Sequence, residues 1–113
     1  MTKREALIRY RHMLDSARKA KVLTQGHTRE DLDSEWVDTL ALVRLLEVIG
    51  EAANRVPSDE QTLHPDIPWS QIIGLRNRLI HGYDAIDLDI LWQIVNQDLD
   101  PLIESLEVIV ASG

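Results

Sequence analysis

Residues 69–83 read WSQIIGLRNRLIHGY, and the spacing of their apolar side chains predicts a helix of about a dozen residues. A single apolar ridge, at positions i, i+3 and i+7, is formed by Ile72, Leu75 and Leu79. Pro68 suits the first position of a helix, and Gly82 stands where helices commonly end. The ridge predicts that this helix packs against a core.

Four polar side chains do not fit a helix that only fills a core. Arg76 falls on the same side as two isoleucines, so a cation is expected to project from a mostly apolar face. Asn77 and His81 are four residues apart and would be neighbours on the adjoining face. His81 falls in the last predicted turn, and Tyr83 follows just past it. A guanidinium, an amide, an imidazole and a phenol are therefore expected together at one helix terminus.

The arrangement Arg76-x4-His81-x-Tyr83 resembles the motif of the HEPN superfamily and is most similar to that of HepT-type toxins. The resemblance covers nearly the whole chain, because it extends to further blocks at 49–53, 64–69 and 87–92. It implies an all-α ribonuclease fold that dimerises with the two motifs gathered at a shared groove.

The first helix has clear signals at both ends. Thr2 and Glu5 match a capping box, so the helix should start near residue 3. Gly26 is the expected stop, which places the end of the helix around residues 23–25.

The second long helix is expected over about residues 34–55 and is apolar around most of its circumference. A helix of that kind is buried on more than one side, which predicts a homodimer interface in addition to a core face. Its few polar positions form one narrow strip that includes Glu47 and Glu51. Two interpretations are open. The strip is a solvated edge, or one of these carboxylates accepts hydrogen bonds from Arg76 or His81, because an unpaired buried charge is costly.

Two further signals concern the connectors and the last helix. Ser58 and Gln61 match a second capping box, which predicts a short helix there. Asp87 is expected to cap the last helix, and Pro101 to kink or divide it, because its ring clashes with a carbonyl of the preceding turn. With no strand-like alternation, the sequence predicts an all-α, antiparallel up-and-down four-helix bundle with short extra helical turns.

Composition favours a cytoplasmic, globular protein. The 113 residues suit a single domain over 1–113, and no apolar run is long enough to span a membrane. The chain has no cysteine, which excludes disulfides and thiolate metal sites. The sequence lacks a dense cluster of His, Asp and Glu at the spacing of metal ligands, so neither a metal nor another cofactor is expected.

Charge is unevenly distributed along the chain. The net charge of −7 argues against broad, non-specific nucleic-acid binding. Residues 1–21 nevertheless carry seven basic side chains against two acidic ones, whereas seven acids and no base follow Tyr83. A polyanion would meet the basic first helix and the motif, and a basic protein could dock on the acidic part. A plain solvated surface is the alternative.

The residue types of the motif suit RNA cleavage without a metal. The nucleophile would be the 2′-hydroxyl of the substrate, with His81 as general base or acid. Arg76 can bind the scissile phosphate, and Asn77 can orient His81 or that phosphate. Arg78 can hold a neighbouring phosphate. On one straight helix Arg76 and His81 point about 140° apart, so two copies related by a two-fold axis are expected to complete the cleft.

The role of Tyr83 is interpreted through the resemblance. In HepT-type toxins the motif tyrosine is the site to which a minimal nucleotidyltransferase antitoxin attaches AMP. The resemblance therefore implies a type VII-like toxin–antitoxin pair, in which modified Tyr83 blocks RNA, and it allows hetero-oligomers larger than a dimer. Two rival hypotheses are a non-catalytic binding subunit of such a nucleotidyltransferase and an ion-pair network that only closes the bundle.

Overall fold

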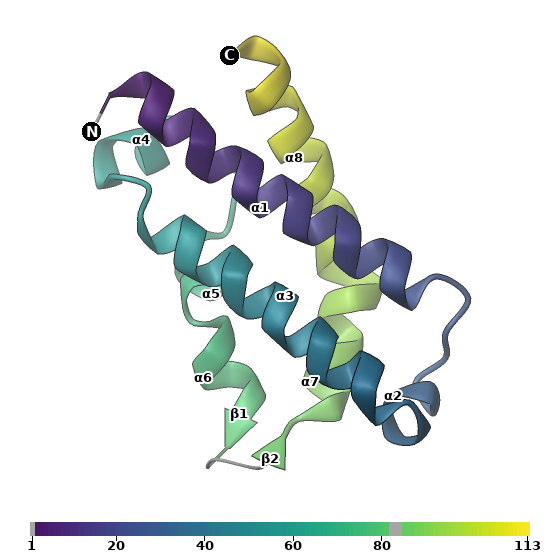
Figure 1. Ribbon diagram of the computed structural model, residues 1–113. Coiled ribbons are helices and arrows are strands. Elements are labelled where there is room, and N and C mark those ends of the chain that lie inside the picture. Colours follow the sequence, from purple (N-terminus) through teal and green to yellow (C-terminus); the bar gives the residue numbers. More distant parts are fainter. Residues whose placement is uncertain (1, 82–84) are drawn as a thin grey trace.

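The computed structural model describes residues 2–81 and 85–113, and helices make up most of them (Figure 1). The helices are α1 (Lys3–Thr24), α2 (Asp31–Ser34), α3 (Trp36–Asn54), α4 (Ser58–Thr62), α5 (Trp69–Ile73), α6 (Leu75–Leu79), α7 (Leu88–Gln93) and α8 (Leu99–Ser112). A π-helical turn, η1 (Ile94–Asp98), joins α7 to α8, and β1 (Ile80–His81) pairs with β2 (Ala85–Ile86). The predicted helical fold class is confirmed, with this small ribbon as an addition.

The first helix begins and ends where its sequence signals predict. The Thr2 hydroxyl accepts a hydrogen bond from the Glu5 amide at 3.1 Å, and the Thr2 amide donates to the Glu5 carboxylate at 3.4 Å. Both halves of the capping box are therefore present. Gly26, with a φ of +79°, follows the helix end in a conformation that favours glycine.

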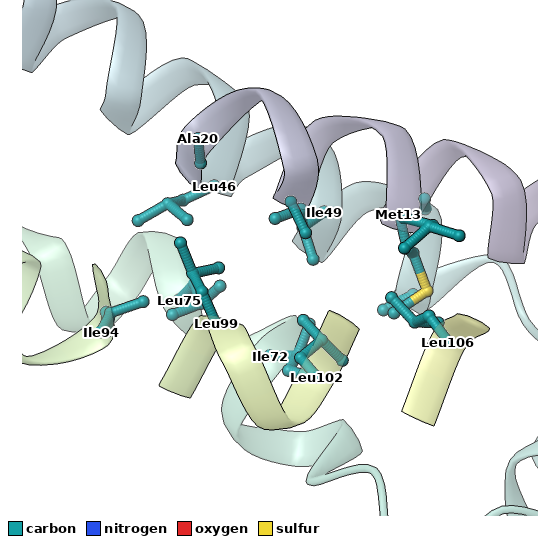
Figure 2. Close-up of a cluster of buried hydrophobic side chains, with 14 of the residues drawn as sticks. Met13, Ala20, Leu46, Ile49, Ile72, Leu75, Ile94, Leu99, Leu102 and Leu106 are labelled. Atoms are coloured by element: carbon teal, nitrogen blue, oxygen red, sulfur yellow. The ribbon is translucent and has the colours of Figure 1, made fainter. Parts of the chain in front are cut away.

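The core lies where α1, α3, the α5–α6 segment and α8 meet. α1 packs most extensively against α3 and then against α8, while α3 also contacts α5 and α6. Figure 2 shows the cluster, with Met13 from α1, Ile49 from α3, Ile72 from α5 and Leu106 from α8. Aliphatic side chains dominate this core, in keeping with a sequence that contains no phenylalanine.

The contact between α3 and α5 depends on a glycine. A Cβ atom added to Gly50 would lie 2.9 Å from the carbonyl oxygen of Ile72, closer than such atoms approach in proteins. The missing side chain lets the backbone of the motif segment come directly against α3. Gly50 therefore sets the depth at which that segment sits.

The prediction of one helix through residues 69–80 is wrong, because the segment is divided twice. α5 ends at Ile73, α6 begins after Gly74, and β1 begins at Ile80. Gly74 favours the first break because glycine is a poor helix former, and β-branched Ile80 suits the extended backbone that follows. The ribbon pairs Ile80 with Ile86 and His81 with Ala85, which also contradicts the expectation that no strand forms.

The predicted capping box before α4 is also wrong. Pro57 occupies the N-cap position of α4, and no side chain caps this helix. The Gln61 side chain instead donates to the carbonyl of Val56 at 2.9 Å. Proline preceding Ser58 sets the extended backbone that a cap residue needs, so Ser58 becomes the first helical residue.

The last long helix is capped as predicted and then changes its winding. The Asp87 carboxylate accepts from the Ile90 amide at 3.0 Å. In η1 the Leu99 amide donates to the carbonyl of Ile94, one residue further back than in an α-helix. This wider turn lies just before the first turn of α8, which contains Pro101. The division predicted for this helix therefore occurs upstream of Pro101, as a change of hydrogen-bond register.

No helix within residues 2–81 and 85–113 is both long enough and apolar enough to cross a membrane.

Candidate functional site

The motif residues are distributed over two elements at the end of the molecule away from both chain termini (Figure 1). Arg76, Asn77 and Arg78 lie in α6, and His81 is the second residue of β1. Because α6 ends at Leu79, the expected placement of His81 in a last helical turn, four residues from Asn77 on a shared face, is wrong. Tyr83 lies outside the described residues.

Arg76 is exposed and reaches towards α3. Its side chain is 74% exposed, and its Nε lies 3.9 Å from Oε2 of Glu47, which is 19% exposed. The guanidinium therefore extends into solvent and not into the core. The structure brings the Glu47 carboxylate and the Arg76 guanidinium together at a long ion-pair distance. A pair this long and this exposed adds little to stability and leaves most of the guanidinium accessible to solvent.

Glu51 is directed elsewhere. Its Oε1 accepts from the Arg44 guanidinium at 3.2 Å, and both side chains are exposed on α3. It still borders the same small hollow as Arg76. This hollow, of about 150 Å³, is lined by Glu47, Gly50, Glu51, Asn54, Ile73 and Arg76. Of the two glutamates singled out from the sequence, only Glu47 lies at ion-pair distance from a motif residue within the described chain.

His81 lies beside the carboxylate of Asp87, a residue that the sequence predicted only as a helix cap. Its Nε2 lies 3.7 Å from Oδ2 of Asp87, and the two side chains are 60% and 31% exposed. The other carboxylate oxygen of Asp87 accepts from the Ile90 amide, so a single side chain serves both the helix terminus and the imidazole. The only sign of this pair in the sequence is that an aspartate stands six residues after His81. The chain reversal that unites them was not predicted.

Asn77 and Arg78 take different positions around α6. Asn77 is exposed, whereas Arg78 is half-buried and borders a second hollow of about 240 Å³ between the motif segment and the start of α8. The two arginines Arg76 and Arg78 therefore line different hollows. No hydrogen bond or ion pair joins Arg76 to His81 among the residues that the structure describes.

The described ranges contain no group of three or more His, Cys, Asp and Glu side chains arranged to hold a metal ion. Within the described residues, the candidate site comprises an exposed guanidinium beside the Glu47 carboxylate and an exposed imidazole beside the Asp87 carboxylate. This set can bind a phosphate and exchange protons with its oxygens.

A second polar cluster lies far from the motif, at the end of the molecule that holds the termini. The Tyr10 hydroxyl donates to Oε1 of Glu60 at 3.2 Å, and the His64 ring meets the Tyr10 ring edge-on, with centroids 5.6 Å apart. Burial, and then the adjacent Glu60 carboxylate, raise the pKa of Tyr10. The cluster borders an open groove of about 740 Å³. The sequence did not reveal it, because its members are up to 54 positions apart.

Comparison with known proteins places these features in a family. The sequence profile described as "Ribonuclease HepT-like" matches residues 13–109. The chain is 35% identical over 97 residues to "Probable ribonuclease HepT" of Thermococcus cleftensis, covering 82% of this chain and 88% of that protein. It is 32% identical over 109 residues to "Putative RNase MJ1380" of Methanocaldococcus jannaschii, covering 96% of this chain and 100% of that protein. No solved structure gives a significant match. The exposed arginine and histidine thus lie in a sequence that aligns over most of its length with that profile, and the chain belongs to the ribonuclease HepT-like family of the HEPN superfamily.

Proposed function

We propose that this chain is a metal-independent endoribonuclease that cleaves RNA with Arg76 and His81. The observation that carries the proposal is that both side chains are exposed at the same end of the molecule, each beside one carboxylate. The names of the relatives, a ribonuclease HepT and an RNase, support the same reaction class.

The proposed reaction uses the RNA as its own nucleophile. The substrate 2′-hydroxyl gives its proton to an imidazole as its oxygen bonds to the adjacent phosphorus, and the bond from phosphorus to the 5′-oxygen breaks. An imidazolium protonates that leaving oxygen, so the products are a 2′,3′-cyclic phosphate and a 5′-hydroxyl. Arg76 neutralises charge on the non-bridging oxygens. Asn77 orients the phosphate or the imidazole, and Arg78 holds a neighbouring phosphate.

Two imidazoles with opposite protonation are most easily supplied by two copies of the chain. We propose a homodimer in which HEPN-like up-and-down four-helix bundles, one domain per chain, pair through the outer face of α3. Three large apolar side chains at the start of that helix are exposed, namely Trp36, Val37 and Leu40. The same helix contributes Glu47 beside Arg76, so an interface on it would bring the two sites close together. His81 of each copy could then act on one phosphate.

We further propose that the enzyme is the toxin of a type VII-like toxin–antitoxin pair acting in the cytoplasm. In this proposal, a minimal nucleotidyltransferase antitoxin transfers AMP to Tyr83, two residues after His81 in the sequence. The transfer joins the tyrosine oxygen to the α-phosphorus of ATP and releases pyrophosphate. Added bulk and negative charge at that position would exclude RNA from a cationic site.

Cleavage of a labelled RNA in EDTA tests the nuclease proposal. Arg76→Ala and His81→Ala should each lower the rate by about 100-fold or more, the factor expected for loss of a group that stabilises transition-state charge and for loss of a positioned acid or base, respectively. The matched control is Arg18→Ala, which removes an exposed guanidinium of α1 paired with Glu107 of α8, away from the motif and from the proposed interface, and should leave cleavage unchanged. Circular dichroism would establish that all variants fold. A wild-type protein that binds a nucleotidyltransferase but never cleaves RNA would instead be a non-catalytic subunit.

Mass spectrometry of the chain incubated with its nucleotidyltransferase and ATP tests the modification. The tryptic peptide that contains Tyr83 should gain the mass of one or more AMP groups, and RNA cleavage should fall in parallel. Tyr83→Phe should carry no AMP and keep its nuclease activity in the presence of the antitoxin. Modification of the Phe variant at an unchanged level would contradict this assignment.

A further inference from the structure

We infer that Asp87 is the positioning residue for His81, selecting the ring nitrogen that exchanges a proton with RNA. The inference rests on the proposed function, because it assigns a role to Asp87 only in a reaction that uses His81. The inference depends on one observation: the two oxygens of the Asp87 carboxylate have different partners. Oδ1 accepts from the Ile90 amide at 3.0 Å, and Oδ2 lies 3.7 Å from Nε2 of His81.

Several backbone contacts hold this carboxylate in place. The Asp87 amide donates to the carbonyl of Leu79 at 2.7 Å, which ties the start of α7 to the end of α6. The ribbon pairs His81 with Ala85, so the imidazole belongs to one strand and the carboxylate of Asp87 follows directly after the other strand. With Oδ1 held by the helix cap, rotation of the carboxylate is restricted, and Oδ2 remains directed at the imidazole.

Among the acids that the structure describes at the start of α7, Asp89 does not compete for this role. Asp89 lies two residues further along, in the first turn of α7, but its Oδ1 accepts from the Arg29 guanidinium at 2.9 Å. Asp87 and Asp89 thus place similar charges at one helix terminus and direct them to different partners. This difference provides a matched control for any effect of charge alone.

The chemical consequence is a defined tautomer of the neutral ring. A carboxylate beside Nε2 favours the tautomer that carries its proton there, because that N–H can donate to it. The lone pair is then on Nδ1, which becomes the nitrogen that accepts the proton of the 2′-hydroxyl. The separation of 3.7 Å is longer than a hydrogen bond, and catalytic hydrogen bonds often shorten only when substrate binds.

Asp87→Asn separates the two tasks of this side chain. Asparagine caps helices about as well as aspartate, so the melting temperature should be unchanged, but its amide no longer places a charged acceptor at Nε2. We expect kcat for RNA cleavage to fall by about 10- to 100-fold with little change in KM, a part of the factor that a positioned proton-transfer group supplies. Asp89→Asn should retain the wild-type kcat. Equal losses in the two variants would overturn the inference, since helix-end charge would then explain both.

NMR provides a readout that does not depend on activity. Correlation of the His81 ring nitrogens with their ring protons should show the Nε2–H tautomer in the wild type and in Asp89→Asn, and its loss in Asp87→Asn. If Asp87→Asn loses the Nε2–H tautomer but the wild type does not cleave RNA, the proposed function is refuted and the pairing of Asp87 with His81 stands. An active wild type whose kcat and tautomer are both unchanged in Asp87→Asn would refute the pairing alone.

Discussion

Tyr10 places a phenol hydroxyl inside the molecule, where Glu60 accepts its hydrogen bond at 3.2 Å. Because the folded state raises the pKa of Tyr10, the unfolded chain loses this proton at a lower pH than the folded protein does. The stabilising contribution is therefore complete below the ordinary tyrosine pKa of 10.0 and declines as the pH rises above it.

Substitution of Tyr10 by Phe tests that dependence. At neutral pH the variant should be less stable by about 1 kcal/mol, the net value of a typical hydrogen bond. The difference from the wild type should narrow above the pH at which an ordinary tyrosine ionises. Urea unfolding followed by circular dichroism at several pH values measures it. A difference that grows with increasing pH would contradict the assigned sign.

Arg76→Ala distinguishes a binding residue from a structural one. The ion pair with Glu47 is long and its cation is largely exposed, so its loss should lower the free energy of unfolding by less than about 1 kcal/mol. A network that closes the bundle would cost about 3–5 kcal/mol when broken, as expected for a buried pair. Thermal or urea unfolding of wild type, Arg76→Ala and Glu47→Gln separates the two cases.

At the scale of residues, sequence patterns identified the helix caps, which depend on near neighbours in the chain. They missed the contacts that form only because the chain reverses its direction. The Thr2–Glu5 cap and the Asp87 cap depend on neighbours within three residues, and both were predicted correctly. The approach of Asp87 to His81 depends on the ribbon between them, which no periodicity indicates. The position of Glu47 beside Arg76 follows from the packing of two helices, so the sequence left it as one of two alternatives.

At the scale of elements, the packing of α5 on α3 is sensitive to a single added methyl group. Gly50→Ala would place a Cβ atom 2.9 Å from the backbone oxygen of Ile72, which cannot rotate away. We expect a loss of about 1–3 kcal/mol from overpacking, although alanine is the better helix former.

The matched control for Gly50→Ala is Asn54→Ala, an exposed position four residues later in the same helix. That change should be neutral or slightly stabilising in urea unfolding. Equal stability of the two variants would show that the motif segment can shift away from α3 without cost.

The start and length of α1 could be predicted because apolar periodicity and end signals agree there. The bounds of α3, Trp36–Asn54, lie within two residues of those expected from its long apolar run. The motif segment could not be predicted, because its apolar ridge also fits a straight helix and hides the breaks at Gly74 and Ile80. In the last helix, Pro101 indicated a disturbance, but the sequence did not show that a π-turn would precede it.

At the scale of the whole molecule, the exposed apolar residues at the start of α3 allow the proposed homodimer to be tested. Leu40→Glu would place a charge in the proposed interface, at a cost of about 3 kcal/mol or more for an unpaired buried charge. The dimer dissociation constant should therefore rise by about 100-fold or more. RNA cleavage should fall with it, although Leu40 is not among the proposed catalytic residues.

Light scattering coupled to size-exclusion chromatography measures this change. Val108→Glu is the matched control, because Val108 is an exposed apolar residue of α8 and outside the proposed interface. It should leave both the dimer and the nuclease unchanged. A Leu40→Glu protein that remains dimeric and active would contradict pairing through this face.

The π-turn η1 has a consequence for how this chain tolerates changes of length. A π-turn holds one residue more than the α-helical turn that it replaces. Removal of one residue within 94–98 would replace the π-turn by an ordinary α-helical turn and keep the apolar positions on both sides of it directed inward. The same single-codon deletion in the middle of α1 or α3 would rotate every following side chain by about 100°. Libraries of one-residue deletions should therefore retain folded, active members at this site while losing them elsewhere in the long helices.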